Sequence, residues 1–329
     1  MRNLTLKQFK TVQAIVSHGK IVSAAKVLGL SPPAVTIQLR QVEEEFQLAL
    51  FDRTSDGMRP TAAGLAFVEA AQAIEERLRM LEDAMDAIKG VRTGSLRLGV
   101  VSTAKYFAPR LMAGFMKEHP DIDMRLAIGN RAETIDRLKN HDIDIALMGR
   151  PPKEVSVRAS VFGDHPLVII APPEHPLASA RDISKERIAE EHFIIREPGS
   201  GTRISLEIFL SDVPGRIDDL GVEMGSNETI KQAVMADLGI AFISAHTIAA
   251  ETEAGRLVIL DVVGLPIRRQ WFSVMRTDHV ISPAMATFND FLMRKGATYL
   301  PLFGKLYPHA EANEAAPRQQ AMALGKRPG

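Results

Sequence analysis

Near the N-terminus, the apolar residues recur at the three- and four-residue spacing of helices. The first run ends at Gly19 and contains Leu6, Phe9, Val12, Ile15 and Val16. The second run ends at Gly29, a residue that can adopt the left-handed conformation of a tight turn, and contains Ile21, Ala24, Ala25 and Leu28. A third helix is predicted after Ser31 as its N-cap, with Pro32 in the first turn and an inner stripe of Val35, Leu39, Val42 and Phe46.

The outer face of the third predicted helix carries side chains suited to DNA. Rotation by about 100° per residue places Pro33, Ile37 and Arg40 opposite the inner stripe. Hydrogen bonds to base edges or phosphates could come from Thr36, Gln38 and Arg40, whereas Pro33 and Ile37 could contact thymine methyl groups. The alternative interpretation is the polar outer face that any amphipathic helix has.

A long helix is predicted within residues 62–93. Its apolar residues follow one another at spacings of three and four, over roughly seven turns at ~3.6 residues per turn: Leu65, Val68, Ala71, Ile74, Leu78, Leu81, Met85 and Ile88. This stripe could pack on the rest of the chain or pair antiparallel with a second copy, and the length of the helix favours pairing. A dimer would also supply the two half-sites that helix-turn-helix proteins bind.

From Ser95 onward, strand-like and helical runs alternate, which is typical of an α/β fold with a doubly wound sheet. The first set of runs spans 95–101, 105–117, 122–128, 133–140 and 143–147. The second set spans 167–171, 193–196, 203–210, 221–224, 230–236 and 239–243. A final strand at 269–275 and a helix at 283–293 most simply return to the first set. We therefore expect two lobes, 94–162 with 268–303 and 163–267, joined by a hinge near Phe162-Gly163 and Leu265-Pro266.

Four short polar segments lie where this fold binds ligands, beyond the carboxyl ends of strands and at helix N-termini. They are 102–103, 129–130, 198–202 and 226–228, and Lys105, Arg131 and Arg203 lie within one turn of them. Each segment alone could be an ordinary helix cap, but four at one cleft favour an anion site. The predicted ligand residues are Ser102, Thr103, Lys105, Asn130, Arg131, Glu197, Ser200, Gly201, Thr202, Arg203 and Asn227.

Charge and composition narrow the classes of protein further. Residues 1–60 hold 8 Lys and Arg against 5 Asp and Glu, so the remainder of the neutral chain holds 32 against 35. A basic N-terminal part followed by an acidic remainder is typical of a protein whose N-terminal part binds phosphates. No apolar run is long enough for a membrane span and no export signal is evident, so we expect a soluble, cytoplasmic protein. The absence of cysteine excludes thiolate chemistry.

Motifs of the common enzyme classes are missing. The nine histidines form no H-x-x-x-H pair, which excludes a helical zinc site. The segment 198–202 lacks both the G-x-S-x-G order of a nucleophile elbow and the terminal Lys-Ser/Thr of a P-loop. Glu197 is interpreted as a hydrogen-bond acceptor rather than an acid–base catalyst. We expect neither an enzyme nor a bound cofactor or metal.

Four segments, AAKVLGLSPPAV, QLRQVEEEF, LFDRT and RPTAAG, resemble the DNA-binding head of the LysR family of transcriptional regulators. The match spans residues 4 to 64 and implies a winged helix-turn-helix domain over 1–61. It also implies that Arg53 and Thr54 lie in a wing, with Arg53 as the family's minor-groove arginine. Many members carry an arginine where this chain has Ile37, so readout by that residue would be apolar. The body is similar to the family's two-lobed effector domain, itself like periplasmic binding proteins.

Over residues 3 to 300 the amino-acid sequence resembles one branch of the family more closely, the activators of Calvin–Benson carbon-fixation operons. The motif Thr36-Ile37-Gln38 fits this branch. The resemblance implies double-stranded promoter DNA, a homodimer or homotetramer, RNA polymerase, and an effector such as ribulose bisphosphate, another phosphorylated metabolite or NADPH. The alternatives are a LysR-type regulator of another operon and a metabolite-binding module without DNA function. Residues 304–329 are predicted to be a flexible tail.

Overall fold

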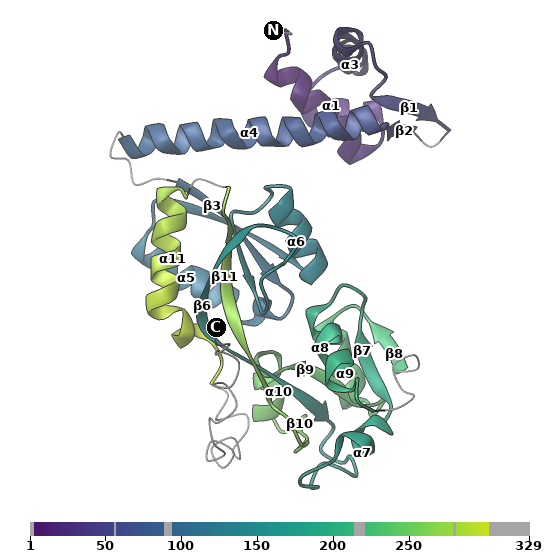
Figure 1. The fold of residues 1–329 in the computed structure, drawn as a ribbon, viewed down its shortest axis with the longest axis vertical. Coiled ribbons are helices and arrows are strands. Elements are labelled where there is room, and N and C mark those ends of the chain that lie inside the picture. The colour runs from purple at the N-terminus through teal and green to yellow at the C-terminus, as the bar shows by residue number, and fades with distance from the viewer. Residues whose placement is uncertain (1–2, 56, 89–93, 214–220, 279–280, 303–329) are drawn as a thin grey trace, which may run out of the picture. The chain divides into compact units, whose positions relative to one another are not determined.

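The computed structural model describes residues 3–55, 57–88, 94–213, 221–278 and 281–302 (Figure 1). The chain divides into two compact units, Met1–Val91 and Arg92–Gly329. The end of the predicted linker, 89–93, and the predicted tail, 304–329, lie outside the described residues.

The N-terminal unit confirms the three predicted helices and the two-stranded wing. Its elements are α1 (Leu6–His18), α2 (Ile21–Leu28), α3 (Pro32–Phe46), β1 (Phe51–Thr54), β2 (Gly57–Pro60) and α4 (Ala62–Ile88). Helix α1 begins with a capping box between Thr5 and Gln8, and α3 begins where the Ser31 hydroxyl accepts a hydrogen bond from the Ala34 amide at 3.4 Å. These caps fix where each helix starts.

One apolar core joins α1, α2 and α3 to the first turns of α4. The Phe67 ring of α4 stacks on Phe9 at 5.1 Å between centroids and meets Phe46 edge-on at 5.9 Å. Farther along α4, Leu81 and Met85 are exposed within the single chain, at 53% and 43%. The start of α4 therefore belongs to the head, while its second half presents apolar side chains without cover from its own unit.

The C-terminal unit has two lobes, the first built around one apolar core cluster and the second around two (Figure 1). The first lobe contains β3 (Gly94–Val101), η1 (Ala104–Tyr106), α5 (Ala108–Glu118), β4 (Ile122–Gly129), α6 (Arg131–Lys139), β5 (Ile145–Met148), α11 (Pro283–Lys295) and η4 (Gly296–Tyr299). The second contains α7 (Lys185–Ala189), β7 (Phe193–Arg196), α8 (Gly201–Phe209), β8 (Gly221–Met224), α9 (Asn227–Met235), β9 (Ala241–Ser244), η3 (Ala245–Thr247), α10 (Ala249–Glu253) and β10 (Val258–Ile259). The α/β alternation predicted from the sequence is confirmed.

The main sheet has strands of both directions. Two further strands, β6 (Val157–Ala171) and β11 (Ile267–Arg276), belong to it. The strand order is β10-β6-β11-β5-β3-β4, with β9 also paired to β6. Strands β4, β3 and β5 run parallel, as in a doubly wound sheet, and β11 joins them antiparallel. Strands β7 and β8 form a separate parallel pair in the second lobe. The carboxyl ends of β3 and β7 thus lead into the loops where ligands are expected.

The two lobes are joined by a pair of long hydrogen-bonded strands, whereas the sequence predicts only a hinge at two crossings of the chain. Strand β6 is continuous through Phe162-Gly163, and its residues 157–167 pair with β11. The predicted strand start at Leu167 is wrong by ten residues, because the mixed burial of 157–163 does not show the alternation of a half-buried strand. The lobes are joined by an antiparallel ladder, which has one irregularity, between Trp271 and Phe272.

Candidate functional sites

Helix α3 presents a small, mostly exposed surface. Ile37 is 57% exposed, and Pro33 and Arg40 also lie exposed on the same face. The Arg40 guanidinium is paired with Glu44 at 2.7 Å on the same helix, and the Thr36 hydroxyl donates to the Pro32 carbonyl at 3.0 Å. Both side chains therefore have a local partner on α3, and an exposed ion pair such as Arg40–Glu44 is weak.

Gln38 has a different environment from the other predicted DNA-binding residues. It is half-buried, and its side-chain oxygen accepts a hydrogen bond from the Thr11 hydroxyl of α1 at 2.6 Å. Next to it, the Gln8 amide donates to the Gln41 side chain at 3.2 Å. These two bonds fix α3 against α1, so Gln38 orients the helix in addition to any contact it makes with DNA.

The wing is held against the turn between α1 and α2. The Met58 amide donates to the Gly19 carbonyl at 2.7 Å, and Gly57 has a φ of 140°. A Cβ on Gly57 would lie 2.3 Å from that carbonyl oxygen, so only glycine allows this approach. Arg53 pairs with Met58 in the ladder and is exposed, while the Thr54 hydroxyl donates to the Gly57 carbonyl at 3.1 Å. The wing thus holds an unburied arginine on a fixed hairpin.

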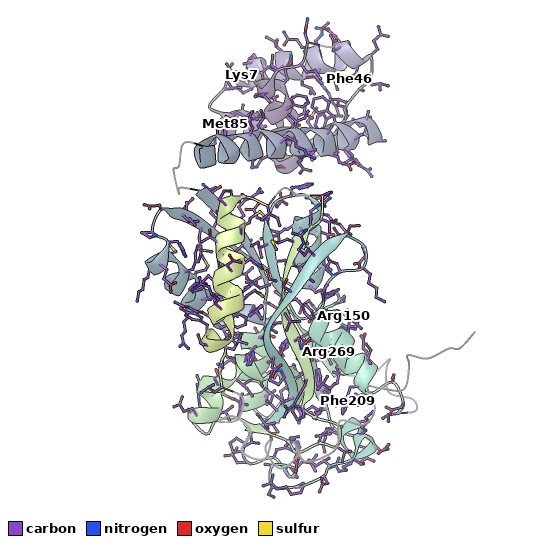
Figure 2. All side chains as sticks on the ribbon, turned by 60° about the vertical axis from the view of Figure 1, so that its left-hand side comes forward. Lys7, Phe46, Met85, Arg150, Phe209 and Arg269 are labelled. Atoms are coloured by element: carbon purple, nitrogen blue, oxygen red, sulfur yellow. The ribbon has the colours of Figure 1, made fainter. Side chains whose placement is uncertain are left out.

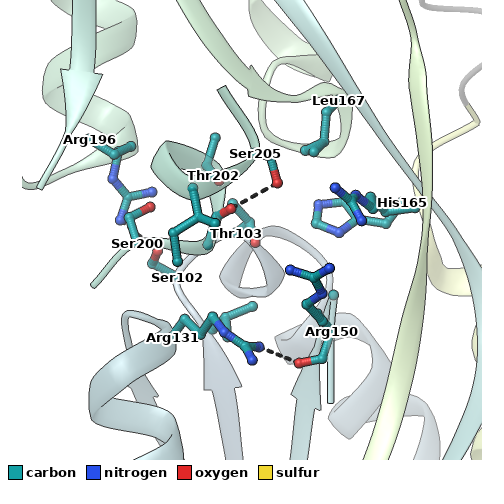
Figure 3. Close-up of a pocket in the computed structure, with 15 residues that line it drawn as sticks. Ser102, Thr103, Arg131, Arg150, His165, Leu167, Arg196, Ser200, Thr202 and Ser205 are labelled. Atoms are coloured by element: carbon teal, nitrogen blue, oxygen red, sulfur yellow. Dashed lines mark hydrogen bonds between the residues drawn. The ribbon is translucent and has the colours of Figure 1, made fainter. Parts of the chain in front are cut away.

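The second site is a pocket in the C-terminal unit, drawn in Figure 3. It is lined by Val101, Ser102, Thr103, Arg131, Gly149, Arg150, His165, Leu167, Arg196, Ser200, Gly201, Thr202, Ile204, Ser205 and Arg269. Of the residues predicted from the sequence, the lining includes Ser102, Thr103, Arg131, Ser200, Gly201 and Thr202. The others, Lys105, Asn130, Glu197, Arg203 and Asn227, are outside this set.

Helix α8 begins at the pocket. Ser200 is its N-cap residue but makes no capping hydrogen bond with its side chain, and the first amide groups of a helix have no partner within the helix. Ser102 and Thr103 follow β3 on the other lobe and face the same space. Hydroxyls and helix amides together form the usual donor set for a phosphate or carboxylate oxygen.

Arg196, which was not predicted, is the central polar residue beside α8. It is 3% exposed, and it donates to both carboxylate oxygens of Glu197, at 2.7 and 2.8 Å. It also donates to the Asn227 side chain at 2.6 Å and, across the cleft, to the Ser102 hydroxyl at 3.0 Å. Glu197 and Asn227 therefore act on the pocket through Arg196. The available sequence signal is an arginine that ends a buried strand just before a glycine-rich loop.

The three remaining predicted residues are engaged outside the pocket. Arg203 pairs with Glu207 at 3.0 Å and with Glu223 at 2.7 Å, and these hydrogen bonds raise the pKa of Arg203. Lys105 lies 3.8 Å from a Glu228 carboxylate oxygen. The Asn130 side chain caps α6 in a capping box with Glu133. Asn130 is therefore a helix cap, which was the alternative to a ligand contact in the sequence analysis.

Two histidines that the sequence did not single out lie beside and behind the pocket. The His165 ring stacks on Trp271 at 3.9 Å between centroids, and the Trp271 indole N–H donates to Nδ1 of His246 at 3.1 Å. Burial lowers the pKa of His246 to about 4. Burial, and then the charges of His246 and Arg269, lower the pKa of His165 well below its usual value. Both imidazoles are neutral at neutral pH.

The pocket has a positively charged lining. Four arginines line it, at positions 131, 150, 196 and 269, and no carboxylate is among the described lining residues. The described part of the chain contains no cluster of side chains suited to a metal ion. Nor does any described helix combine the length and apolar character that crossing a membrane requires.

Comparison with known proteins places both units in one family. Residues 6–65 match the model of the bacterial regulatory helix-turn-helix protein of the lysR family, and residues 89–297 match the LysR substrate binding domain. The chain belongs to the LysR family. As a LysR regulator it is a DNA-binding transcription factor rather than an enzyme, which confirms the expectation from the sequence.

Relatives of this LysR protein include regulators of carbon fixation. It is 62% identical to the HTH-type transcriptional regulator CbbR of Rhizobium meliloti (strain 1021), over 94% of this chain and 98% of the relative. It is 45% identical to the RuBisCO operon transcriptional regulator of Allochromatium vinosum, over 90% and 97%. Among solved structures, the regulatory domain of Synechocystis PCC6803 CcmR in complex with 2-PG is 36% identical, with a TM-score of 0.57, over 61% of this chain and 97% of that domain.

Proposed function

We propose that this LysR protein regulates the transcription of carbon-fixation operons, and that it activates them when a small anionic metabolite binds between its effector lobes. The observation that carries the proposal is the 62% identity to CbbR of Rhizobium meliloti along nearly the whole of both chains. The arginine-lined pocket supports an anionic effector, such as a sugar phosphate or NADPH. The 2-PG complex of the related CcmR domain supports the same class of ligand.

The switch is proposed to be a shift between two arrangements of the lobes. An effector that contacts Ser102 on one lobe and Thr202 on the other binds one arrangement better, and it shifts the equilibrium only by that difference in affinity. Copies of the chain would pair through the exposed apolar stripe of α4, which includes Leu81 and Met85, to give a dimer or tetramer. The change would alter the spacing of the heads on promoter DNA, with RNA polymerase as the further partner. Such a protein would act in the cytoplasm, where the chromosome lies.

Arg53 is proposed as a groove contact, and Arg53→Ala tests this. Without the guanidinium, affinity for duplex DNA is expected to fall, and the slope of log affinity against log salt is expected to become shallower by about 1. The measurement is a salt titration by fluorescence anisotropy. Arg53→Lys is the matched control, because it keeps the charge and should retain the slope. A titration curve of Arg53→Ala that coincides with that of the wild type would exclude Arg53 from the interface.

Thr202 is proposed to bind the effector at the start of α8. Its side chain is 7% exposed and lines the pocket. Loss of one hydrogen bond to a charged group is expected to weaken the metabolite response of Thr202→Ala by about 10- to 100-fold, with basal DNA binding near normal. Ser211→Ala removes an exposed hydroxyl beyond the other end of α8 and is the control. Gel-shift assays with and without effector measure both properties, and an equal loss of both would refute the assignment.

A further inference from the structure

The two lobes of the C-terminal unit also touch away from the pocket, where η1 of the first lobe meets α9 and η3 of the second. Phe107, which follows η1, is fully buried and meets the His246 ring of η3 edge-on, at 6.4 Å between centroids. The ring of Tyr106, the last residue of η1, faces the Lys231 ammonium of α9, with 4.7 Å from Nζ to the ring centroid. This contact between the lobes is additional to the pairing of β6 with β11.

The ammonium group of Lys231 is the central polar group of this contact, and it is buried. It donates to the Thr247 carbonyl at 3.1 Å and to a Glu251 carboxylate oxygen at 2.8 Å, and a Glu228 oxygen lies 3.1 Å away. These three acceptors match the three N–H bonds of an ammonium group, and all of them belong to the second lobe. The Tyr106 ring is the contribution of the first lobe.

The contact of Tyr106 with Lys231 is a cation–π interaction across the lobes. The negative face of an aromatic ring attracts a cation most strongly where water is excluded. Because this ammonium is buried, the attraction lies in the strong part of that range. A rotation of the lobes that moved η1 away from α9 would separate the ring from the cation.

An ion pair crosses the same boundary. Nζ of Lys105, also on η1, lies 3.8 Å from a carboxylate oxygen of Glu228, which is partly exposed. Such a pair contributes little by itself. Glu228 also contacts Lys231, however, so one carboxylate lies between two lysines of different lobes. We call Lys105, Tyr106, Glu228 and Lys231 the latch.

The latch lies close to the pocket along the chain without lining it. Arg150 and Arg269, labelled in Figure 2, are lining residues of the pocket, and no latch residue is among them. Ser102 lines the pocket and lies just before η1, while Asn227, which binds the pocket arginine Arg196, begins α9 one turn before the latch lysine. The segments η1 and α9 thus connect the pocket to the latch.

We propose that the latch holds the lobes in the arrangement seen here, and that it thereby sets the balance between lobe arrangements before any effector binds. The inference rests on the proposed function, because it assumes that regulation works through the lobes. A desolvated cation–π contact corresponds to roughly 30-fold in an equilibrium constant. Since an effector shifts the balance only by its difference in affinity for the two arrangements, the latch determines how large that difference must be.

Distances between two spin labels test the latch in the full chain. The protein has no cysteine, so Glu186→Cys on α7 and Ala286→Cys on α11 place one label on each lobe at exposed positions. Labelled chains are diluted into unlabelled protein, so that double electron–electron resonance measures distances within one chain. Tyr106→Leu is expected to shift the ratio of the two arrangements by roughly 30-fold and to populate a second distance.

Two further variants make the result decisive. Tyr299→Leu is the matched control, because Tyr299 packs on Phe291 within the first lobe, and it should keep the wild-type distance. Glu228→Lys changes a partly exposed side chain, so it is expected to fold normally, and its repulsion of Lys105 should populate the same second distance as Tyr106→Leu.

Two outcomes would overturn the latch. The first is a wild-type distance distribution in both Tyr106→Leu and Glu228→Lys. The second is the appearance of the second distance in Tyr299→Leu as well, since loss of packing within one lobe would then explain the change. Neither DNA nor effector is present in this measurement, so failure of the latch would leave the proposed regulatory function standing.

Discussion

Arg196→Ala is expected to lower the free energy of unfolding of the effector unit by about 3–5 kcal/mol. The reason is that removing the buried Arg196 leaves the carboxylate of Glu197, whose side chain is only 19% exposed, without its ion-pair partner. Two further hydrogen bonds, to Asn227 and to Ser102 across the cleft, are lost with it. Urea unfolding followed by Trp271 fluorescence measures this unit selectively, because the chain has a single tryptophan and it is buried here.

Arg203→Ala provides the matched control. Arg203 also pairs with two glutamates, but those carboxylates are partly exposed, so the expected loss is at most about 1 kcal/mol. Similar losses for the two variants would contradict the structural role given to Arg196. A variant of Arg196 that retained full stability would show that its buried network is not formed in solution.

His246 is expected to make the stability of the effector unit fall in mild acid. Its pKa is lowered by burial to about 4, whereas the unfolded chain has a histidine pKa of about 6.5. Below the unfolded value, the unfolded state binds a proton that the folded state does not bind, so stability is fully present above that value and decreases as the pH falls toward about 4. Between about pH 7.5 and about pH 5, the expected loss from this group is about 2 kcal/mol.

Comparison of the wild type with His246→Gln isolates this contribution. Glutamine can still accept the indole hydrogen bond of Trp271 but does not titrate. His165 contributes acid sensitivity in the same direction and is present in both proteins. Urea unfolding followed by circular dichroism should therefore show a smaller decrease for the variant by about 2 kcal/mol. If the stability difference between the two proteins did not change with pH, His246 would not be the neutral buried group described here.

The helices of the N-terminal unit could be predicted from local sequence signals. Ser31 and Pro32 start α3, Gly19 and Gly29 end the helices before it, and the apolar spacing gives the inner faces. These signals act within a few residues along the chain, which is why they could be recognised without a structure. The helix end of the pocket was predictable for the same reason, since Ser200, Gly201 and Thr202 have the composition of a helix N-terminus at a ligand site.

The part of the pocket lining that contains His165 and Arg269 depends on contacts between residues that are far apart in the sequence. His165 meets Arg269 because of the register between β6 and β11, and no local pattern specifies a register between strands a hundred residues apart. Arg203 shows the converse: its position near a helix start suggested a ligand contact, but Glu207 and Glu223 already bind it. Side-chain direction within a helix turn decides this, and composition alone does not reveal it.

We propose that one chain joins an N-terminal unit that binds DNA to a C-terminal unit that binds an anionic effector. The most direct test titrates the purified protein, by fluorescence anisotropy, onto a labelled duplex from upstream of its own gene, at increasing salt and with or without a sugar bisphosphate. We predict binding that weakens steeply with salt, because phosphates are neutralised by Lys and Arg, and a shift of the binding curve with the bisphosphate. Failure to bind this duplex even in dilute buffer would contradict the account.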